Sequence, residues 1–203
     1  MKKFDVLTII NVLTSKAYKI IAGKPFLLNI VGIRSVETSP NKFDDMLVCF
    51  FKEADNKWRV FYWNITTDPG LYWLKNPLNV NGTAILVEGQ YLDAYQLGLH
   101  HGKYQALVQA KPVKAYRDND RDAAFDKDPK KIDSGLFGIN IHRASEVQSY
   151  AVDKWSAGCQ VFQNGENFRD FIQICMKAEA LNGNSFSYTL LNEKDFLSNG
   201  ITT

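Results

Sequence analysis

The sequence predicts a single α+β domain that is mainly β, with helices at its periphery. The chain has 203 residues, a length that suits one domain with one core. Aromatic residues make up 13% of it, while few segments show a long helical pattern. Many aromatics with few helices are typical of a β-rich core. No internal repeat, low-complexity linker or break in composition divides the chain, so we expect one domain over residues 1–203.

The N-terminal part, residues 1–24, is predicted to be a helix. Apolar residues recur at helical spacing through residues 3–21, at Phe4, Leu7, Ile10 and Leu13. A glycine and a proline directly after this segment end the pattern.

The same segment also has features of an export signal, because two lysines precede a largely apolar stretch. Asp5 and Asn11 interrupt that stretch, and it has no clean cleavage site of small residues. We therefore expect an amphipathic helix, and no clear signal peptide.

Residues 26–162 are predicted to form the β-rich core. Apolar runs and turn residues indicate strands at residues 26–35, 46–52, 58–65, 83–86, 105–109, 112–116, 137–142 and 156–162. The second and third of these form a hairpin, and an Asp-Pro-Gly turn follows at residues 68–70. The polar segment 117–134 is predicted to be an exposed loop. The C-terminal part, residues 163–203, adds a helix at 166–180 and a strand at 186–191.

Composition and charge limit the classes of partner. The formal net charge of +2 gives no case for a nucleic-acid-binding protein, and no apolar run is long enough to span a membrane. Three cysteines do not make a disulfide framework. They fit a reducing compartment, or one special thiol beside two buried ones. We expect a monomer without a membrane span or a nucleic-acid partner.

The segment 135–162 places a plausible base close in sequence to a plausible nucleophile. Side chains alternate along a strand, so Asn140 and His142 point to one face while Ile139 and Ile141 point to the core. A histidine held on rigid backbone and presented outward suits a general base.

Cys159 follows small residues, which allow a substrate carbonyl to approach the backbone closely. Gly158 tolerates backbone conformations that other residues avoid. Contact with His142 would stabilise the thiolate. The residues alone leave a second interpretation open, in which a buried thiol and a structural histidine lie side by side. Cys49 and Cys175 lie in apolar segments and are predicted to be inert core residues.

At these positions the chain resembles the L,D-transpeptidase (YkuD-like) catalytic domain. That family has a histidine, a gap, and then Ser/Thr-His-Gly-Cys; the matching positions are His142, Ser156, Gly158 and Cys159. Thirteen residues separate His142 from Ser156, at the short end of the family's range. The resemblance covers residues 135–162 and extends loosely to the turn at 66–70.

The resemblance implies a β-sandwich with peripheral helices and a cysteine enzyme that acts on peptidoglycan stem peptides. Cys159 would attack an amide carbonyl, and His142 would activate the thiol and protonate the leaving amine. The N–H groups at Gly158 and Cys159 would stabilise the oxyanion, with Ser156 bonded within the loop. Asn140 or a backbone carbonyl would orient the imidazole. A thioester would then pass to an amine or to water, without a cofactor.

This chain departs from the family pattern beside the cysteine. Ala157 replaces the second histidine, and Gln160-Val161 stands where an apolar residue and an arginine are expected. Arg143 is the candidate to supply a guanidinium. We therefore expect Arg143, Gln160 and Tyr104 to contact substrate.

The place of action follows from the same resemblance. We expect the protein to act on the cell wall, in the periplasm or at the cell surface. The lack of a clear signal peptide suits a phage-encoded protein. Two other classes remain: a non-catalytic wall-binding or phage structural protein that keeps the fold, and another cysteine amidase.

Two further polar clusters are candidate sites. Carboxylates at spacing similar to an EF-hand loop suggest calcium, at Asp118, Asp120, Asp122 and Asp126. Alanine and proline stand where that motif needs glycine and glutamate, so an exposed acidic loop is the alternative. The pair His100-His101 cannot easily bind one metal, because adjacent side chains on an extended segment diverge. It is either an exposed turn or a loop at a substrate cleft.

Overall fold

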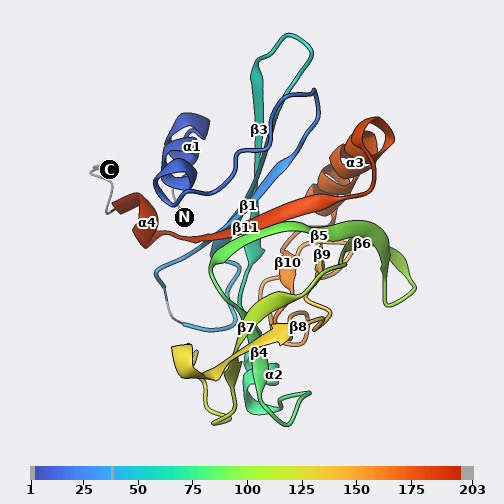
Figure 1. The fold of residues 1–203 in the computed structure, drawn as a ribbon. Helices are drawn as coiled ribbons and strands as arrows, with labels where there is room; N and C mark the ends of the chain where they lie inside the picture. Colours follow the sequence, from blue (N-terminus) through green and yellow to red (C-terminus); the bar gives the residue numbers. More distant parts are fainter. Residues whose placement is uncertain (1–2, 38, 198–203) are drawn as a thin grey trace.

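The structure is a computed structural model that describes residues 3–37 and 39–197, and it is mainly β (Figure 1). This confirms the predicted α+β, mainly β class. The predicted domain limits at residues 1 and 203 lie outside the described residues.

Eight strands close on themselves into a barrel with the order β1-β11-β5-β6-β9-β10-β3-β2. These strands are β1 (Asn29–Arg34), β2 (Asp45–Lys52), β3 (Trp58–Thr66), β5 (Gly89–His100), β6 (Tyr104–Gln109), β9 (Ile141–Arg143), β10 (Gln160–Phe162) and β11 (Phe186–Asn192). A separate sheet has the order β4-β7-β8, formed by β4 (Thr83–Leu86), β7 (Val113–Asp118) and β8 (Ile132–Gly135). The strands therefore do not form the two stacked sheets of the sandwich that the resemblance implied.

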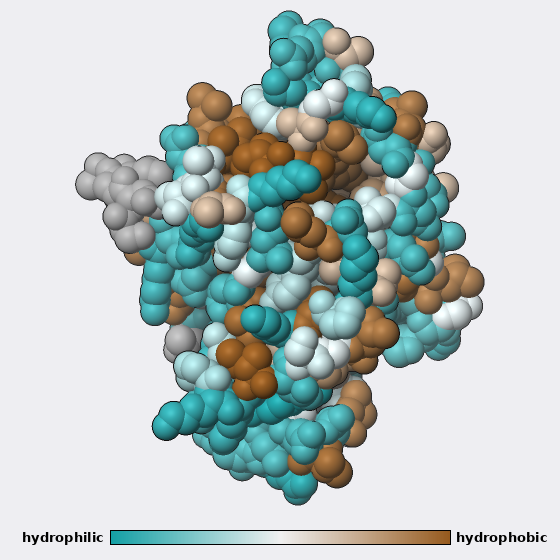
Figure 2. Space-filling view, in the orientation of Figure 1, coloured by the Kyte–Doolittle hydropathy of each residue, from teal (hydrophilic) through white to brown (hydrophobic). Residues whose placement is uncertain are grey.

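Helices cover the barrel from different sides. They are α1 (Val6–Ser15), α2 (Leu71–Lys75), α3 (Gly165–Asn182), α4 (Lys194–Leu197) and the short 3-10 helix η1 (Pro129–Lys131). Figure 1 shows α1 and α4 on one side of the strands and α3 on the other. On the face seen in Figure 2, hydrophobic residues gather in the upper part, between α1 and β3, and hydrophilic residues dominate the lower part.

Burial on both faces explains the continuous apolar run in β2. Leu47 and Cys49 belong to the main core with Phe171 of α3, whereas Val48 and Phe50 belong to a second cluster against α1. A strand covered on both faces reads as an unbroken hydrophobic run.

The predicted N-terminal helix exists but is shorter than residues 3–21. The Asp5 carboxylate accepts hydrogen bonds from the N–H groups of Leu7 and Thr8 and so caps α1 at its start. The helix ends at Ser15, and Ala17 has a positive φ of 56°, which no helix accommodates. Among the described residues, no helix is long and apolar enough to cross a membrane.

Five elements were not predicted: β5, β8, the short helices α2 and α4, and η1, which lies with β8 in the segment predicted to be an exposed loop. Gly89 and Gly98, residues that weaken a local strand signal, both belong to the twelve-residue β5. Gly98 stands there because an added Cβ would lie 2.8 Å from a methyl carbon of Val108 on β6. The predicted strand 137–142 begins only at Ile141, after Gly138 with a φ of +71°.

Candidate active site

The site is built where two short parallel strands begin side by side. In the register of β9 and β10, Ile141 faces Gln160 and His142 faces Val161. The residues just before each strand are therefore neighbours, and the Gln160 N–H donates to the carbonyl of Asn140 at 2.9 Å. This pairing brings the predicted base and the predicted nucleophile to the same end of the barrel.

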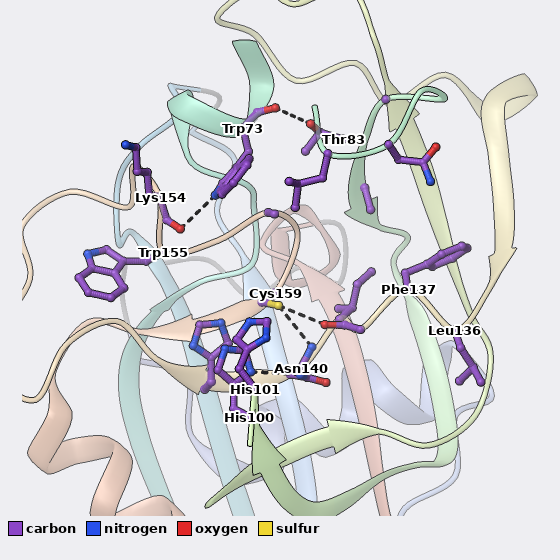
Figure 3. A pocket seen from close by; sticks show the side chains of 18 of the residues that line it. Trp73, Thr83, His100, His101, Leu136, Phe137, Asn140, Lys154, Trp155 and Cys159 are labelled. Atoms are coloured by element: carbon purple, nitrogen blue, oxygen red, sulfur yellow. Dashed lines mark hydrogen bonds between the residues drawn. The ribbon is translucent and has the colours of Figure 1, made fainter. Parts of the chain in front are cut away.

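A cavity of about 740 Å³ opens at this end, and both Cys159 and His142 line it. Figure 3 shows Cys159 near the centre, with Trp73 and Thr83 on one side and His100 and His101 on the other. The small sheet β4-β7-β8 and the segment before β9 complete the wall. Part of that wall is apolar, formed by Leu136, Phe137, Ile139 and Ala84.

The thiol of Cys159 is half-buried and contacts two backbone groups of the segment before β9. The Asn140 N–H donates to Sγ, and Sγ–H donates to the carbonyl of Gly138, each over 3.4 Å (Figure 3). Burial raises the pKa of the Cys159 thiol to about 11, although the Asn140 N–H acts in the opposite direction. The resting sulfur is therefore protonated near neutral pH.

The imidazole of His142 is only 4% exposed and is fixed through Nδ1. Nδ1 lies 2.8 Å from the carbonyl oxygen of Arg143, so Nδ1 carries the hydrogen and Nε2 has a free lone pair. Burial, and to a smaller extent the neighbouring His100, lower the pKa of His142 to about 3. The ring is therefore neutral near pH 7, with Nε2 able to accept a proton.

The two side chains line the same cavity but are not hydrogen-bonded to each other. Among the described residues, no hydrogen bond joins Cys159 Sγ to the ring of His142, although both face one cavity rather than separate cores. Because burial raises the pKa of the thiol and lowers that of the imidazole, we expect both groups to be neutral near pH 7 and not to form an ion pair.

The loop that presents Cys159 is held by Ser156, whose side chain is fully buried. Its Oγ donates to the carbonyl of Cys159 at 2.9 Å and accepts from the N–H of Gly158 at 3.2 Å. Ser156 thus bonds within the loop as predicted. Because the Gly158 N–H is occupied, it is not free for an oxyanion. No hydrogen bond among the described residues uses the Cys159 N–H, which leaves it as the available donor.

Gly158 is required for a second reason. Its φ is +118°, and an added Cβ would lie 2.3 Å from the carbonyl oxygen of Ala84 on β4. The loop therefore packs directly against the small sheet, in a conformation that suits glycine.

Asn140 does not orient the base, contrary to one of the two predicted possibilities. Its Oδ1 accepts the N–H of Gln109, and its Nδ2 lies 3.1 Å from Nδ1 of His100. The other possibility holds, because the backbone carbonyl of Arg143 orients His142.

The predicted substrate contacts lie apart from the Cys159 cavity. Gln160 is fully buried; its Nε2 donates to the carbonyl of Gly158, and its Oε1 accepts from the hydroxyl of Tyr188. This corrects its expected role, since it supports the loop from within the core. The Arg143 guanidinium lies over the Tyr104 ring, 4.3 Å from its centroid, and pairs with Glu146 at 3.0 Å.

Tyr104 lies behind the base. Its hydroxyl donates to the carbonyl of Arg143 at 3.2 Å and lies 3.4 Å from Nδ1 of His142. Tyr104 and Arg143 line an adjoining groove of about 470 Å³ that also reaches His142.

The acidic loop does not gather ligands for calcium. Among the described residues, no three His, Cys, Asp or Glu side chains form a group that could hold a metal ion. The carboxylates accept backbone N–H groups of their own loop, from Asp126 to Asp118, from Asp122 to Asp120 and from Ala124 to Asp122. Asp120 and Asp122 thus form Asx-type turns, and the bond to Asp118 joins the two ends of this loop.

The position of His100 against the ring of His142 is the part of the site that the sequence did not indicate. The pair His100-His101 was predicted to be either an exposed turn or a loop at a substrate cleft, and the structure places both histidines on the cavity. The polar and aromatic composition of residues 100–104 was the available signal, but only the barrel closure brings this segment to His142.

Comparisons of the chain with protein-family models, with curated proteins and with solved structures found no match. The assignment to the L,D-transpeptidase family therefore stays a prediction that rests on the motif within residues 135–162.

Proposed function

We propose that the protein is a cysteine-dependent acyl-transfer enzyme, with Cys159 as the nucleophile and His142 as the general base. The observation that carries this proposal is that a half-buried thiol and a neutral imidazole with a free Nε2 line one cavity. Structural cysteines such as Cys49 and Cys175 lie fully inside the core, away from any such base.

The reaction follows from the protonation states. As Sγ attacks the carbonyl carbon of an amide, His142 Nε2 takes the thiol proton, and an S–C bond forms. The Cys159 N–H donates to the developing oxyanion. The protonated His142 then gives its proton to the leaving nitrogen, the C–N bond breaks, and a thioester remains.

The second half of the reaction releases the acyl group. An amine or a water molecule attacks the thioester while His142 Nε2 takes its proton, and the thiol leaves with that proton. Transfer to an amine cross-links two peptides, and transfer to water hydrolyses one.

Proton transfer accompanies the attack and does not precede it. With a thiol pKa of about 11 and an imidazole pKa of about 3, the proton stays on sulfur in the resting protein. His142 therefore acts as a general base on a neutral thiol during the attack on the substrate.

The proposed substrate is a peptidoglycan stem peptide, as in L,D-transpeptidases, with cross-linking and L,D-peptidase hydrolysis both possible outcomes. The charge of the cavity supports such a substrate. Its charged lining residues are Arg117 and Lys154, and no carboxylate lines it among the described residues. An acyl donor with free carboxylates, as stem peptides have, suits this lining.

The test is incubation of the protein with purified muropeptides, followed by mass spectrometry. We expect loss of a terminal residue, cleavage of the stem or formation of dimers, and none of these with Cys159→Ala. His142→Gln, which keeps a polar side chain of similar length, should reduce turnover by at least ~100-fold.

Two results would contradict the proposal. Turnover retained by Cys159→Ala would exclude the thiol as nucleophile. No change of any muropeptide by the wild-type protein, together with binding to intact sacculi, would favour the non-catalytic wall-binding class. Cleavage of other amides alone would favour another cysteine amidase.

A further inference from the structure

His100 lies against the proposed base although it comes from a distant part of the chain. It is the last residue of β5 and only 7% exposed. Its ring stacks on that of His142, with the centroids 4.0 Å apart and the planes 18° from parallel. Two imidazoles packed face to face can be stable only if at least one of them is uncharged.

The hydrogen bonds around His100 define its tautomer. The N–H of Gln109 donates to Asn140 Oδ1 at 2.9 Å, so the other end of the amide, Nδ2, is the group that faces His100. Nδ2 can only donate, so Nδ1 of His100 accepts and its hydrogen is on Nε2.

His142 has the opposite arrangement. Its Nδ1 donates to the carbonyl of Arg143 and its Nε2 is unprotonated. Burial lowers the pKa of His100 to about 4, as it lowers that of His142 to about 3. Both rings are therefore neutral near pH 7, and each is fixed by one hydrogen bond through Nδ1.

The other titratable and charged groups near the pair come from several elements. They are His101 and Lys103 after β5, Tyr104 on β6, Arg143 on β9 with its ion-pair partner Glu146, and Cys159 before β10, with Lys154 on the same cavity wall. No carboxylate among the described residues bonds to either ring. The surroundings therefore oppose a positive charge on either histidine.

Asn140 connects this pair to the nucleophile. Its side chain anchors His100, and its backbone N–H donates to Cys159 Sγ. One residue thus sets the positions of both the thiol and the ring that supports the base.

We propose that His100 is a positioning residue for His142: anchored by Asn140, its ring holds the imidazole of His142 neutral and in place, with Nε2 free to take the Cys159 proton. This inference rests on the proposed function for its catalytic meaning, but its structural content does not depend on knowing the substrate. His100 acts through His142 and need not touch the substrate.

The experiment compares two substitutions that separate the ring of His100 from its hydrogen bond. His100→Asn keeps an acceptor for Asn140 but removes the stacked ring. His100→Phe keeps a stacked ring but removes the acceptor. Leu99→Ala is the control, since Leu99 is the preceding residue on β5 and is 55% exposed. Circular dichroism and thermal melting establish that each variant is folded.

The main readout is the titration and tautomer of His142 measured by NMR. In the wild-type protein, the Leu99→Ala control and His100→Phe, we expect Nδ1–H on His142 and a strongly lowered pKa. In His100→Asn the His142 pKa should rise by at least ~1 unit toward its ordinary value, because the ring gains water. A His142 pKa and tautomer unchanged in His100→Asn would overturn the inference, as would His100→Phe raising the pKa equally.

The pH profile of turnover adds a catalytic readout. A raised His142 pKa protonates the base at acid pH, so the acid limb of kcat should move upward in His100→Asn, with KM little changed. The two proposals can fail separately. If the NMR result is as expected while no muropeptide reacts, the positioning role stands and the proposed enzyme function fails. If turnover occurs but His142 is unaffected in His100→Asn, the enzyme function stands and the positioning role fails.

Discussion

Burial raises the thiol pKa of both Cys159 and Cys175, yet the surroundings of the two residues differ. Cys175 is fully buried on α3, within the main core. Cys159 is half-buried at a loop end, bonded to the N–H of Asn140 and the carbonyl of Gly138, and it faces a cavity. Burial raises the pKa of both thiols, to about 11 at Cys159 and well above the ordinary value at Cys175.

A low thiol pKa therefore does not distinguish the proposed nucleophile from the core cysteine. Cys159 differs from Cys175 in three ways: it faces a cavity, a neutral imidazole lines the same cavity, and its own backbone N–H is free. Reactivity would then come from geometry and from proton transfer during attack.

The largest expected effect comes from replacing each thiol by a hydroxyl. Cys159→Ser should reduce muropeptide turnover by about a thousand-fold or more, because serine is a much weaker nucleophile at this position. Cys175→Ser should leave turnover nearly unchanged but lower the free energy of unfolding by about 1–3 kcal/mol, since it buries a hydroxyl in an apolar core. Turnover and chemical denaturation of both variants provide the measurement.

The opposite pattern would remove the distinction between the two cysteines. If Cys159→Ser lost stability and kept activity, Cys159 would be a core residue and the cavity would have no nucleophile.

Alkylation with iodoacetamide tests the protonation state of the two thiols. The thiolate fraction of a group with a pKa of about 11 rises about 100-fold between pH 8 and pH 10, and the Cys159 labelling rate should follow. Cys175 should remain unlabelled while the protein is folded. Mass spectrometry of tryptic peptides quantifies each site, and circular dichroism confirms the fold at each pH. A labelling rate that is already flat between pH 6 and pH 8 would indicate a preformed thiolate.

Two glycines with positive φ are compared next: Gly158 in the Cys159 loop and Gly183 at the end of α3, the helix that carries Cys175. Gly158→Ala places a Cβ 2.3 Å from the Ala84 carbonyl at a φ of +118°, so the Cys159 loop must shift. We expect a stability loss of about 1–3 kcal/mol and a fall in turnover of at least ~10-fold. Gly183→Ala, at the end of α3 with a φ of +92° and open space around it, should cost about 1 kcal/mol without changing turnover.

Equal losses of turnover in the two glycine variants would contradict this interpretation. Such a result would mean that activity follows global stability and not the geometry of the Cys159 loop. Thermal melting and kcat, measured on the same preparations, distinguish the two cases.

The parts of the fold that sequence could predict are those with strong local signals. The β2–β3 hairpin, α3 and β11 have unbroken apolar patterns with clear turns or caps, and all were predicted within a few residues. In contrast, β5 contains two glycines that resemble breaks, and β8 lies in a charged segment. Their strand conformation is imposed by pairing with β6 and β7, which no local pattern encodes.

The same division holds for the candidate site. His142, Cys159 and Ser156 were predicted because they lie close in sequence and share a motif. His100 and Gln109 come from β5 and β6, and only the closed strand order places them beside Asn140. Gln160 was misplaced because alternation along a three-residue strand does not reveal that both its faces are covered.

The smallest expected effect on turnover comes from two polar side chains, one in the loop that presents Cys159 and one at the start of α3, which carries Cys175. Ser156 fastens the Cys159 loop, and Asn164 caps α3 by accepting the N–H groups of Glu166 and Asn167. Both substitutions to alanine should cost about 1–2 kcal/mol of stability.

Only Ser156→Ala should also lower kcat, by about 3–10-fold, because the Cys159 carbonyl and the Gly158 N–H lose their shared partner and the free Cys159 N–H is less well aimed. Steady-state kinetics at matched folded fractions would show the difference. If Asn164→Ala lowered kcat as much as Ser156→Ala, the loop bonds would matter for folding alone. The distinction between the two cysteines would then rest on the cavity and not on the precision of the loop.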